Sequence, residues 1–559
     1  MKNKCFFAKA LMMLAAVLWM GQLCAQTRNA GNATGPQPLV GDYLNVRVPK
    51  PGELGKQISP QAAKQVRTLV VDGVLNYDDI KVIKSIADRS RCENERGKSV
   101  ENFLDLDLSH AHFANTWRTD RYAVASEMFY SMSALRSVRL PADVREVGKK
   151  AFYNCHRLVT VEMSQAVRVL GEEAFRGCSR LKHVTMSSQL DEIGKRCFYE
   201  CKEFTWVRLP DHLSIIGDEA FYGCSLTEVQ LPARLQTLGY NAFGDNKLKQ
   251  LYLPQTTQVV NGFPGGGTTM EYIEVERGNR YHASLDGVLY DASMTTLQFF
   301  PRALSGSFSV PASVTSIGNY AFFGSRLSQV VLPETVTYIG DGAFQSCSLL
   351  QSVNLPSQLT EIRPSTFLGC ARLSGVVLPQ GIKAIGKAAF SGCVSITSLF
   401  LPAGVSQLGE EAFKECKALA RINLPEGVTV LPRECFRNCE GFTGVELPQR
   451  LIKIDEECFR GCLNLTTVRL PSSLREIGDE AFRSCGLLQE VEIPASVTAM
   501  GSKPFAKCEG LKRIVCRAQQ PPSLKSTDHK DVPLFVPGSS IDSYKKAKTW
   551  KKFKNVNVL

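Results

Sequence analysis

A phenylalanine recurs along most of this 559-residue chain at a nearly constant interval, and that interval constrains the fold more than any other feature. Almost every step is 23 residues, and two are 22. The recurring residues are Phe129, Phe152, Phe175, Phe198, Phe221 and Phe243, and after a break Phe322, Phe344, Phe367, Phe390, Phe413, Phe436, Phe459, Phe482 and Phe505. A fixed period of this length predicts one repeated structural unit rather than several globular domains.

The unit that begins at Leu465 shows the pattern most clearly. Counting Leu465 as position 1, apolar residues occupy positions 1, 4, 6, 10 and 13, with Pro at 7, Gly at 14, Ala-Phe at 17 and 18, and Cys at 21. Val468 and Leu470 alternate with polar neighbours, which predicts a strand with one buried face. Pro471 ends that strand because it has no N–H to donate. The segment 480–485 predicts a single helical turn on the return leg.

One such unit cannot bury its apolar residues alone, whereas stacked units can, because their Phe, Leu and Ile rows become continuous. The pattern LxxVxLPxxLxxIGxxAFxxC resembles the BspA-like leucine-rich repeats of surface proteins from anaerobic bacteria. The resemblance extends from about Leu69 to the end. It implies an α/β solenoid, a horseshoe with a concave parallel β-sheet, and binding or adhesion roles, and it fixes no ligand.

The pattern divides the chain into successive segments. We expect a flexible leader at 26–40, N-terminal capping repeats at 41–125, regular repeats at 126–253 and 311–515, an irregular repeat with a hairpin insert at 254–310, and a C-terminal cap at 516–559. In the N-terminal cap, Asp78 opens an amphipathic helix that continues through Ala87. In the irregular repeat, Asp286-Gly287 between alternating residues predicts a hairpin turn.

The first 25 residues resemble a secretory signal peptide. Three lysines precede an apolar run, Ala10–Met20, and cleavage is expected after Ala25. Cys24 follows Leu23 rather than the small residue usual before a lipidated cysteine, so we do not expect a lipoprotein. No later stretch is long and apolar enough to span a bilayer. We therefore expect a secreted or cell-surface protein.

The formal net charge of +12 is concentrated at the two ends of the chain. Three lysines lie in the predicted signal peptide, and the last stretch adds six lysines against one aspartate, so about +4 remains for everything between. A long basic face is absent from this pattern, and we expect no nucleic-acid partner.

Cysteine is abundant, with 19 residues in total and 17 after removal of the signal peptide. Most occupy position 21, where equivalent side chains point the same way into the core and cannot converge on each other as a disulfide requires. We expect a ladder of small, buried, reduced thiols. Second cysteines at Cys197, Cys435 and Cys458 stand where other units have alanine.

Few residues suggest chemistry. His110 and His112 alternate along a predicted strand and could share a metal, but no third ligand is evident. Gly265-Gly266-Gly267 lacks the Lys-Ser/Thr of a phosphate-binding loop and predicts a flexible loop. Nucleophile-elbow and HExxH motifs do not occur. We expect no enzyme, cofactor or metal, although a catalytic site within 254–310 remains an alternative.

A row of charges has two interpretations. Glu411, Glu434, Glu457 and Glu480 share one repeat position, and Lys414, Arg437, Arg460 and Arg483 share another three residues later. These rows could form a polyanion-binding stripe, or a ladder of solvated salt bridges, each worth under about 1 kcal/mol. We favour the ladder.

Positions 3 and 5 of the predicted strand face the concave surface, where stacking does not dictate residue type. The candidate binding residues there are aromatic, apolar or arginine: Trp206, Arg208, Tyr252, Val331, Val377, Phe400, Arg421 and Arg469. Such residues dominate binding hot spots. We expect a protein or glycan partner, such as host matrix or other cells. The alternative to an adhesin is a structural spacer that binds nothing strongly.

Overall fold

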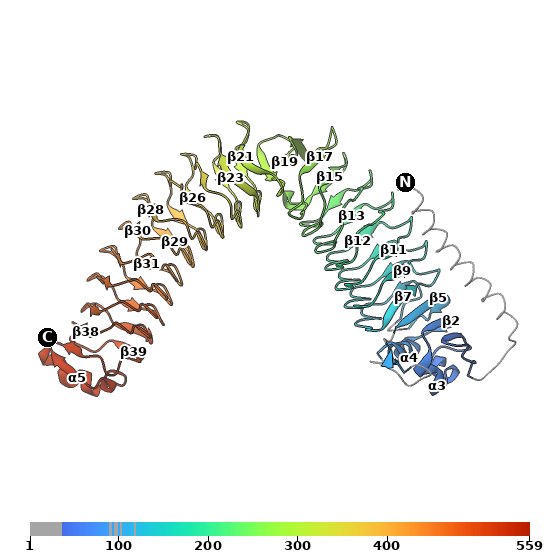
Figure 1. The fold of residues 1–559 in the computed structure, drawn as a ribbon, viewed down its shortest axis with the longest axis horizontal. Coiled ribbons are helices and arrows are strands. Elements are labelled where there is room, and N and C mark those ends of the chain that lie inside the picture. Colours follow the sequence, from blue (N-terminus) through green and yellow to red (C-terminus); the bar gives the residue numbers. More distant parts are fainter. Residues whose placement is uncertain (1–35, 89–91, 94–98, 101–102, 117–118) are drawn as a thin grey trace. The chain divides into compact units, whose positions relative to one another are not determined.

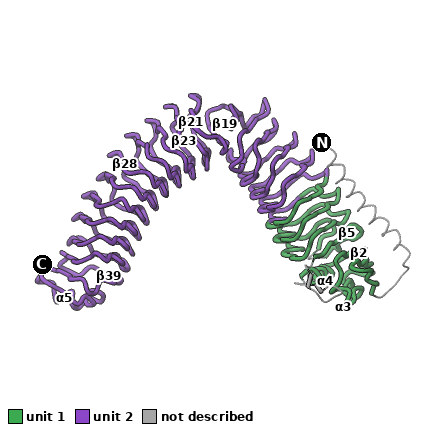
Figure 2. Tube along the Cα trace, viewed as in Figure 1, with its two compact units in different colours: residues 1–169, 177–187 green, residues 170–176, 188–559 purple. Residues whose placement is uncertain are grey.

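The computed structural model of the chain describes residues 36–88, 92–93, 99–100, 103–116 and 119–559. The predicted signal peptide and most of the predicted leader lie outside these residues. Among the residues described, no helix has the length and hydrophobicity to cross a membrane. The chain divides into two compact units, which we call unit 1 (1–169 and 177–187) and unit 2 (170–176 and 188–559), coloured green and purple in Figure 2.

Unit 1 is a stack of parallel strands in sequence order. Its main sheet contains β1 (Tyr43–Val48), β2 (Thr68–Leu75), β5 (Leu104–Phe113), β7 (Leu135–Arg139), β9 (Thr160–Glu162) and β11 (His183–Thr185). The short strands are β3 (Cys92–Glu93), β4 (Ser99–Val100), β6 (Ala123–Val124) and β8 (Glu146–Val147), and β10 (Val169–Leu170) lies at the division between the units. Every neighbouring pair in the main sheet is parallel, as stacked repeats require.

The helices of unit 1 lie at its N-terminal end: α2 (Leu54–Gln57), α3 (Pro60–Gln65) and α4 (Tyr77–Ala87). The amphipathic helix predicted from Asp78 is α4. Its N-terminus is fixed by a capping box between Asn76 and Asp79, and Ile80 and Ile83 are buried. This cap satisfies N–H groups that the first helical turn leaves without partners.

In unit 2 most regular coils contribute short strands to two parallel ladders, whereas the coils that begin at Phe204, Leu226 and Leu373 contribute a strand only to the second (Figure 1). The first ladder lies at positions 3–6 and comprises β15 (Gln250–Leu253), β17 (Tyr272–Val275), β21 (Ser305–Ser309), β23 (Arg326–Val331), β25 (Ser352–Val353), β28 (Ser398–Phe400), β30 (Arg421–Asn423), β32 (Gly444–Val445), β34 (Thr467–Val468), β36 (Glu490–Ile493), β38 (Arg513–Cys516), β40 (Leu534–Val536) and β41 (Val556–Val558). These are the strands that the alternating pattern predicts.

The second ladder, at positions 12 and 13, is a feature that the sequence pattern did not predict. Its strands are β12 (Glu192–Ile193), β13 (Ile215–Ile216), β14 (Thr237–Leu238), β16 (Gln258–Val259), β20 (Thr296–Phe299), β22 (Ser316–Ile317), β24 (Tyr338–Ile339), β26 (Glu361–Ile362), β27 (Ala384–Ile385), β29 (Gln407–Leu408), β31 (Val430–Leu431), β33 (Lys453–Ile454), β35 (Glu476–Ile477), β37 (Ala499–Ser502) and β39 (Ser523–Ser526). Most contain two residues, too few to show a period in sequence.

The return leg is a run of turns rather than the predicted helical turn. Glu480 and Ser484 have φ of 50° and 60°, in the left-handed region. The Arg483 N–H donates to the Glu480 carbonyl at 2.9 Å, as in a turn. The Phe482 N–H instead donates to the Pro504 carbonyl of the next coil at 2.8 Å. Because alternate N–H groups leave for the neighbouring coil, an α-helical ladder cannot form.

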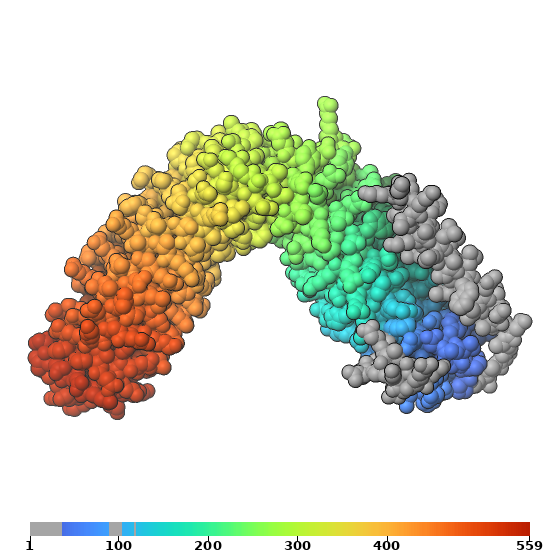
Figure 3. All heavy atoms as spheres, in the orientation of Figure 1, coloured from blue at the N-terminus to red at the C-terminus, as the bar shows by residue number. Residues whose placement is uncertain are grey.

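The recurring phenylalanine forms the spine of the core. Phe413 is 1% exposed and stacks on Phe390 and Phe436, with ring centroids 5.8 and 5.4 Å apart. The stack is continuous from Phe322 to Phe505. On the side shown in the space-filling view, successive coils of unit 2 pack without gaps (Figure 3).

The cysteine ladder is buried, as predicted, and the described cysteines form no disulfide. Each position-21 thiol donates to the carbonyl of the phenylalanine one coil earlier, as Cys416 does to the Phe390 oxygen at 3.1 Å. Asn246 replaces cysteine in one coil, and its Nδ2 makes the same bond to the Phe221 oxygen at 2.7 Å. Cysteine and asparagine at this position thus both donate to the phenylalanine carbonyl of the preceding coil. Burial raises the pKa of the Cys416 thiol to about 12, so it stays protonated.

The irregular repeat contains the predicted hairpin. Strands β18 (His282–Leu285) and β19 (Val288–Asp291) pair antiparallel around Asp286-Gly287, whose φ values are 51° and 80°. A short η1 (Val260–Gly262) precedes it. The prediction of a flexible loop at 265–267 was wrong, because all three glycines are buried and packed. A Cβ on Gly267 would lie 1.6 Å from the Asn246 oxygen, so this backbone fits against the preceding coil only without side chains.

Unit 2 ends in η2 (Gly538–Ser540), α5 (Ile541–Lys546) and η3 (Trp550–Lys552), which flank the last strands. Tyr544 and Trp550 are buried, and each donates to a backbone carbonyl at 2.8 Å, those of Ala518 and Pro522. Both aromatic rings cover apolar surface that the last regular coil would otherwise leave exposed.

Candidate binding surface

The exposed side chains at positions 3 and 5 of unit 2 form a surface that we call the first-ladder face. Alternation places them there: Leu399 and Leu401 are 2% and 3% exposed, whereas Phe400 between them is 71% exposed. Each buried neighbour packs into the continuous core of the stack. The pleat fixes which residues face outward but not their identity.

Val377 and Phe400 occupy position 5 of adjacent coils and form what we call the Val377–Phe400 patch. Val377 is 82% exposed, the largest value among the described large apolar residues. The position-3 neighbours Gly375 and Ser398 are too small to cover them. Val331 is 40% exposed and lies two coils before Val377. This patch is open to a partner.

Two asparagines flank the patch along the same row. The Asn354 amide accepts from the Leu332 N–H and donates to the Leu332 oxygen, both at 2.7 Å. The Asn423 amide brackets Leu401 in the same way, at 2.7 and 2.9 Å. Because these amides are engaged with the backbone of the preceding coil, the patch between them offers a ligand mainly apolar contact.

The other predicted residues lie on the same face but not in one cluster. Trp206 and Arg208 share one coil, and Tyr252 lies two coils later. Trp206 is 54% exposed and Tyr252 46%. Arg208, Arg421 and Arg469 are exposed, and none forms an ion pair with another described residue.

Sequence reasoning missed three exposed residues near Trp206. Glu228, Gln250 and Tyr272 occupy position 3 of the three coils that follow it. Tyr272 lies in the break between Phe243 and Phe322, where no regular phenylalanine marks the phase of the repeat. The 22-residue step between these four residues is the signal that could have found them.

The charged row on the return leg forms a continuous chain of ion pairs. Nitrogen–oxygen distances range from 2.5 to 3.3 Å along Glu411, Lys414, Glu434, Arg437, Glu457, Arg460, Glu480 and Arg483. Burial alone would raise the pKa of Glu434, but hydrogen bonds from Lys414 and Arg437 outweigh it and lower that pKa. This geometry favours a salt-bridge ladder, because each basic group already has acidic partners.

The remaining candidates for chemistry are held in structural contacts. In unit 1, His110 is exposed, while His112 Nδ1 lies 2.9 Å from the Asp143 carboxylate. No group of three potential metal ligands occurs among the described residues. In the irregular repeat, buried His282 accepts from the Val259 N–H at 2.8 Å through Nε2, and its Nδ1 lies 2.7 Å from Gln298 Oε1. Burial lowers the pKa of His282, which keeps it neutral.

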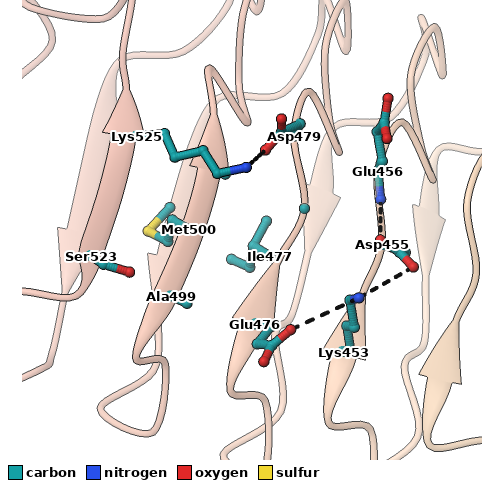
Figure 4. Close-up of a pocket in the computed structure, with 12 residues that line it drawn as sticks. Lys453, Asp455, Glu456, Glu476, Ile477, Asp479, Ala499, Met500, Ser523 and Lys525 are labelled. Atoms are coloured by element: carbon teal, nitrogen blue, oxygen red, sulfur yellow. Dashed lines mark hydrogen bonds and ion pairs between the residues drawn. The ribbon is translucent and has the colours of Figure 1, made fainter.

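A hollow lies over the second ladder, beside β33, β35, β37 and β39 (Figure 4). Its volume is about 320 Å3. Lys525 pairs with Asp479 at 3.0 Å, and Lys453 pairs with Asp455 at 3.3 Å. The Ser523 hydroxyl donates to the Thr498 carbonyl at 3.3 Å rather than to a base. Both lysines of the lining are thus paired with carboxylates, and among the residues that line the hollow no nucleophile is paired with a base.

Stacked coils with parallel ladders, a phenylalanine spine and an open strand face define a leucine-rich-repeat solenoid. The family model for the BspA type leucine rich repeat region matches residues 103–205, 191–263, 298–420 and 406–520. These segments cover more than half of the chain, which therefore belongs to the BspA-type leucine-rich-repeat family. No curated protein matches the sequence.

Among solved structures, a leucine rich cell surface protein from Faecalibacterium prausnitzii is 27% identical, with a TM-score of 0.51 over 60% of this chain and 92% of that one. A leucine-rich repeat protein from Eubacterium ventriosum is 21% identical, with a TM-score of 0.45 over 63% and 83%. One from Bacteroides ovatus is 20% identical, with a TM-score of 0.35 over 76% and 92%. The chain is thus similar to a bacterial leucine-rich cell-surface protein.

Proposed function

We propose that this chain is an exported, adhesin-like binding protein that engages a protein or glycan partner through the first-ladder face. The observation that carries the proposal is the Val377–Phe400 patch, whose side chains are 82% and 71% exposed although the stack has no need of them. Exposed apolar patches of this kind mark interaction sites on soluble proteins.

The energetic argument rests on Phe400. A partner that buries this ring gains roughly 1.5–3 kcal/mol from one side chain. The small neighbours Gly375 and Ser398 leave room for such contact. The charged row contributes less, because its groups already satisfy one another and an added ligand would have to displace existing pairs.

Export is part of the proposal and rests on the basic and apolar character of residues 1–25. The function needs no catalytic group or cofactor. Similarity to a bacterial cell-surface protein supports the same location.

Capture experiments test the proposal. The full chain without residues 1–25 is immobilised and exposed to extracts of host extracellular matrix and of neighbouring bacteria. Phe400→Ala should reduce capture of a specific partner, while Leu463→Ala should not. Leu463 is a matched control, since it is apolar and 48% exposed but lies outside the first-ladder face. Capture of no specific partner would favour the spacer alternative, and equal capture by wild type and Phe400→Ala would place binding outside the Val377–Phe400 patch.

A further inference from the structure

Four successive coils of unit 2 present an ordered set of side chains at position 3. Trp206 and Tyr272 stand at the two ends, with Glu228 and Gln250 between them, each 22 residues from the next. Parallel pairing of β15 with β17 sets Gln250 directly beside Tyr272. All four side chains are exposed. At about 4.8 Å per coil, the backbone segments that carry the two aromatic residues are roughly 14 Å apart.

The surface is hollowed within this row. The hollow has a volume of about 360 Å3 and is lined by Thr227, Glu228, Val229, Lys249, Gln250, Glu271 and Tyr272. Tyr272 is its aromatic wall, and Glu228 and Gln250 supply a carboxylate and an amide. The Lys249 ammonium lies 3.4 Å from the Glu271 carboxylate, so the one cation of the lining is paired within the hollow.

The hairpin of the irregular repeat holds the Tyr272 ring in place. A Cβ on Gly287 would lie 2.7 Å from Tyr272 Cδ2, so the turn at Asp286-Gly287 packs against the ring. The ring nevertheless keeps 44% of its surface exposed. A ring fixed before binding loses little conformational entropy when a ligand stacks on it. The hairpin therefore positions the Tyr272 ring for ligand stacking in addition to closing the irregular repeat.

We infer that the row from Trp206 to Tyr272, with the hollow that Glu228, Gln250 and Tyr272 line, binds a neutral oligosaccharide. This inference rests on the proposed function, in that it assigns a ligand class to one part of the first-ladder face. Aromatic faces carry negative electrostatic potential that attracts the C–H groups on the apolar side of a sugar ring. Carboxylate and amide groups accept and donate the hydrogen bonds that neighbouring hydroxyls require.

Charge discriminates among saccharides. Glu228 is an unpaired acid in the lining, whereas Lys249 is neutralised by Glu271. A sulfated or uronate-rich chain would meet repulsion from Glu228 and find no free cation in the lining, since Arg208, which is exposed in the coil of Trp206, lies outside that lining. The Val377–Phe400 patch lacks this combination, because its flanking amides are engaged with backbone. The two parts of the face therefore suit different ligands.

Calorimetric titration of the full chain without residues 1–25 tests the inference. The probes are maltohexaose, cellohexaose, laminarihexaose and mannohexaose at millimolar concentration, with a heparin hexasaccharide as the anionic counterpart. We expect at least one neutral hexasaccharide to bind and heparin not to bind. Trp206→Ala should raise the Kd about tenfold, the scale of a modest hot spot. Gln250→Ala should raise it roughly fivefold through loss of a hydrogen bond.

Matched variants separate binding from folding. Tyr272→Phe should retain binding, because it keeps the ring, and Tyr272→Ala should lose it; thermal melts report whether the hairpin survives. Phe400→Ala should leave saccharide binding unchanged. The two proposals can fail separately. If wild type binds a neutral saccharide but Phe400→Ala does not reduce partner capture, binding through the Val377–Phe400 patch is refuted and the saccharide site is retained. Absence of binding by every neutral probe, binding by heparin alone, or an unchanged Kd in Trp206→Ala would overturn the inference.

Discussion

The return leg and the first-ladder face of unit 2 come from the same repeat and differ in how their residues are used. On the return leg the same residue types recur from coil to coil, and each group finds its partner in the next coil, as Arg437 does in Glu457 at 3.0 Å. On the first-ladder face position 5 changes from valine to phenylalanine to asparagine within three coils. Positions whose residue type recurs from coil to coil stabilise the stack, whereas positions whose residue type varies are available to bind a ligand.

In unit 1, charged residues on the strands of the main sheet pair with one another. Arg139 on β7 pairs with Asp107 on β5 at 3.0 Å and with Glu162 on β9 at 2.6 Å. Hydrogen bonding to Glu162 is the largest of the effects that raise the pKa of Arg139. Because these charges of unit 1 satisfy one another, the exposed aromatic and apolar residues of unit 2 are the better candidates for a binding surface.

The largest expected effect is on a return-leg residue inside the stack. Phe413→Ala should lower the free energy of unfolding by about 3–5 kcal/mol, as large core truncations do, because its ring packs between two coils. Denaturant melts of wild type and variant measure the change. A difference below roughly 1 kcal/mol would show that the Phe413 ring contributes little to packing between coils.

A pH effect of intermediate size should arise at the irregular repeat. The pKa of His282 is lowered by burial, so the neutral form is favoured in the folded state. Its contribution to stability is present above the unfolded pKa of about 6.5 and is lost as pH falls through the lower folded pKa. Protonation would break the bond accepted from Val259, at about 1–3 kcal/mol.

Melts between pH 7 and pH 5 test this prediction. The wild type should lose stability over that range more steeply than His282→Gln. Carboxylates with lowered pKa, such as Asp291 and Glu434, lose their contributions as pH falls further and are common to both proteins. Parallel curves for the two proteins would show that His282 does not contribute to the pH dependence.

The smallest effect is expected in the charged row. Arg460→Ala should cost about 1 kcal/mol or less, because Glu457 keeps its second partner, Arg437, at 3.0 Å. Most of that loss should be screened by salt. Denaturant melts at low and high salt measure it, and a loss of several kcal/mol that salt does not change would mean that the row is part of the buried core.

Much of this arrangement could be read from the sequence, and the failures have physical causes. Alternation predicted the first ladder, and a helix start signal predicted α4. The second ladder was not predicted because a two-residue strand is too short to show an alternation of apolar and polar residues. The return-leg turns escaped because Glu480 and Ser484 adopt left-handed backbone without the glycine that usually announces it.

Some residues of the candidate binding surface could be predicted from the sequence and others could not. Val377 and Phe400 could be selected because the phase of the repeat is unambiguous there. Tyr272 was missed because it lies in the irregular repeat, where no regular phenylalanine marks the phase, although its 22-residue spacing from Gln250 could have revealed it. The pairing of Lys249 with Glu271 and the hollow beside them depend on side-chain placement, which repeat spacing does not specify.

One comparison tests the central claim most directly, namely that the first-ladder face binds and the return leg stacks. Affinity for a captured partner is measured with Phe400→Ala, Trp206→Ala and Arg460→Ala, at low and moderate salt. We expect at least one of the first two to weaken binding about tenfold, while Arg460→Ala changes it little. Loss of binding in Arg460→Ala alone, with wild-type binding removed by moderate salt, would contradict the account and assign binding to the charged row.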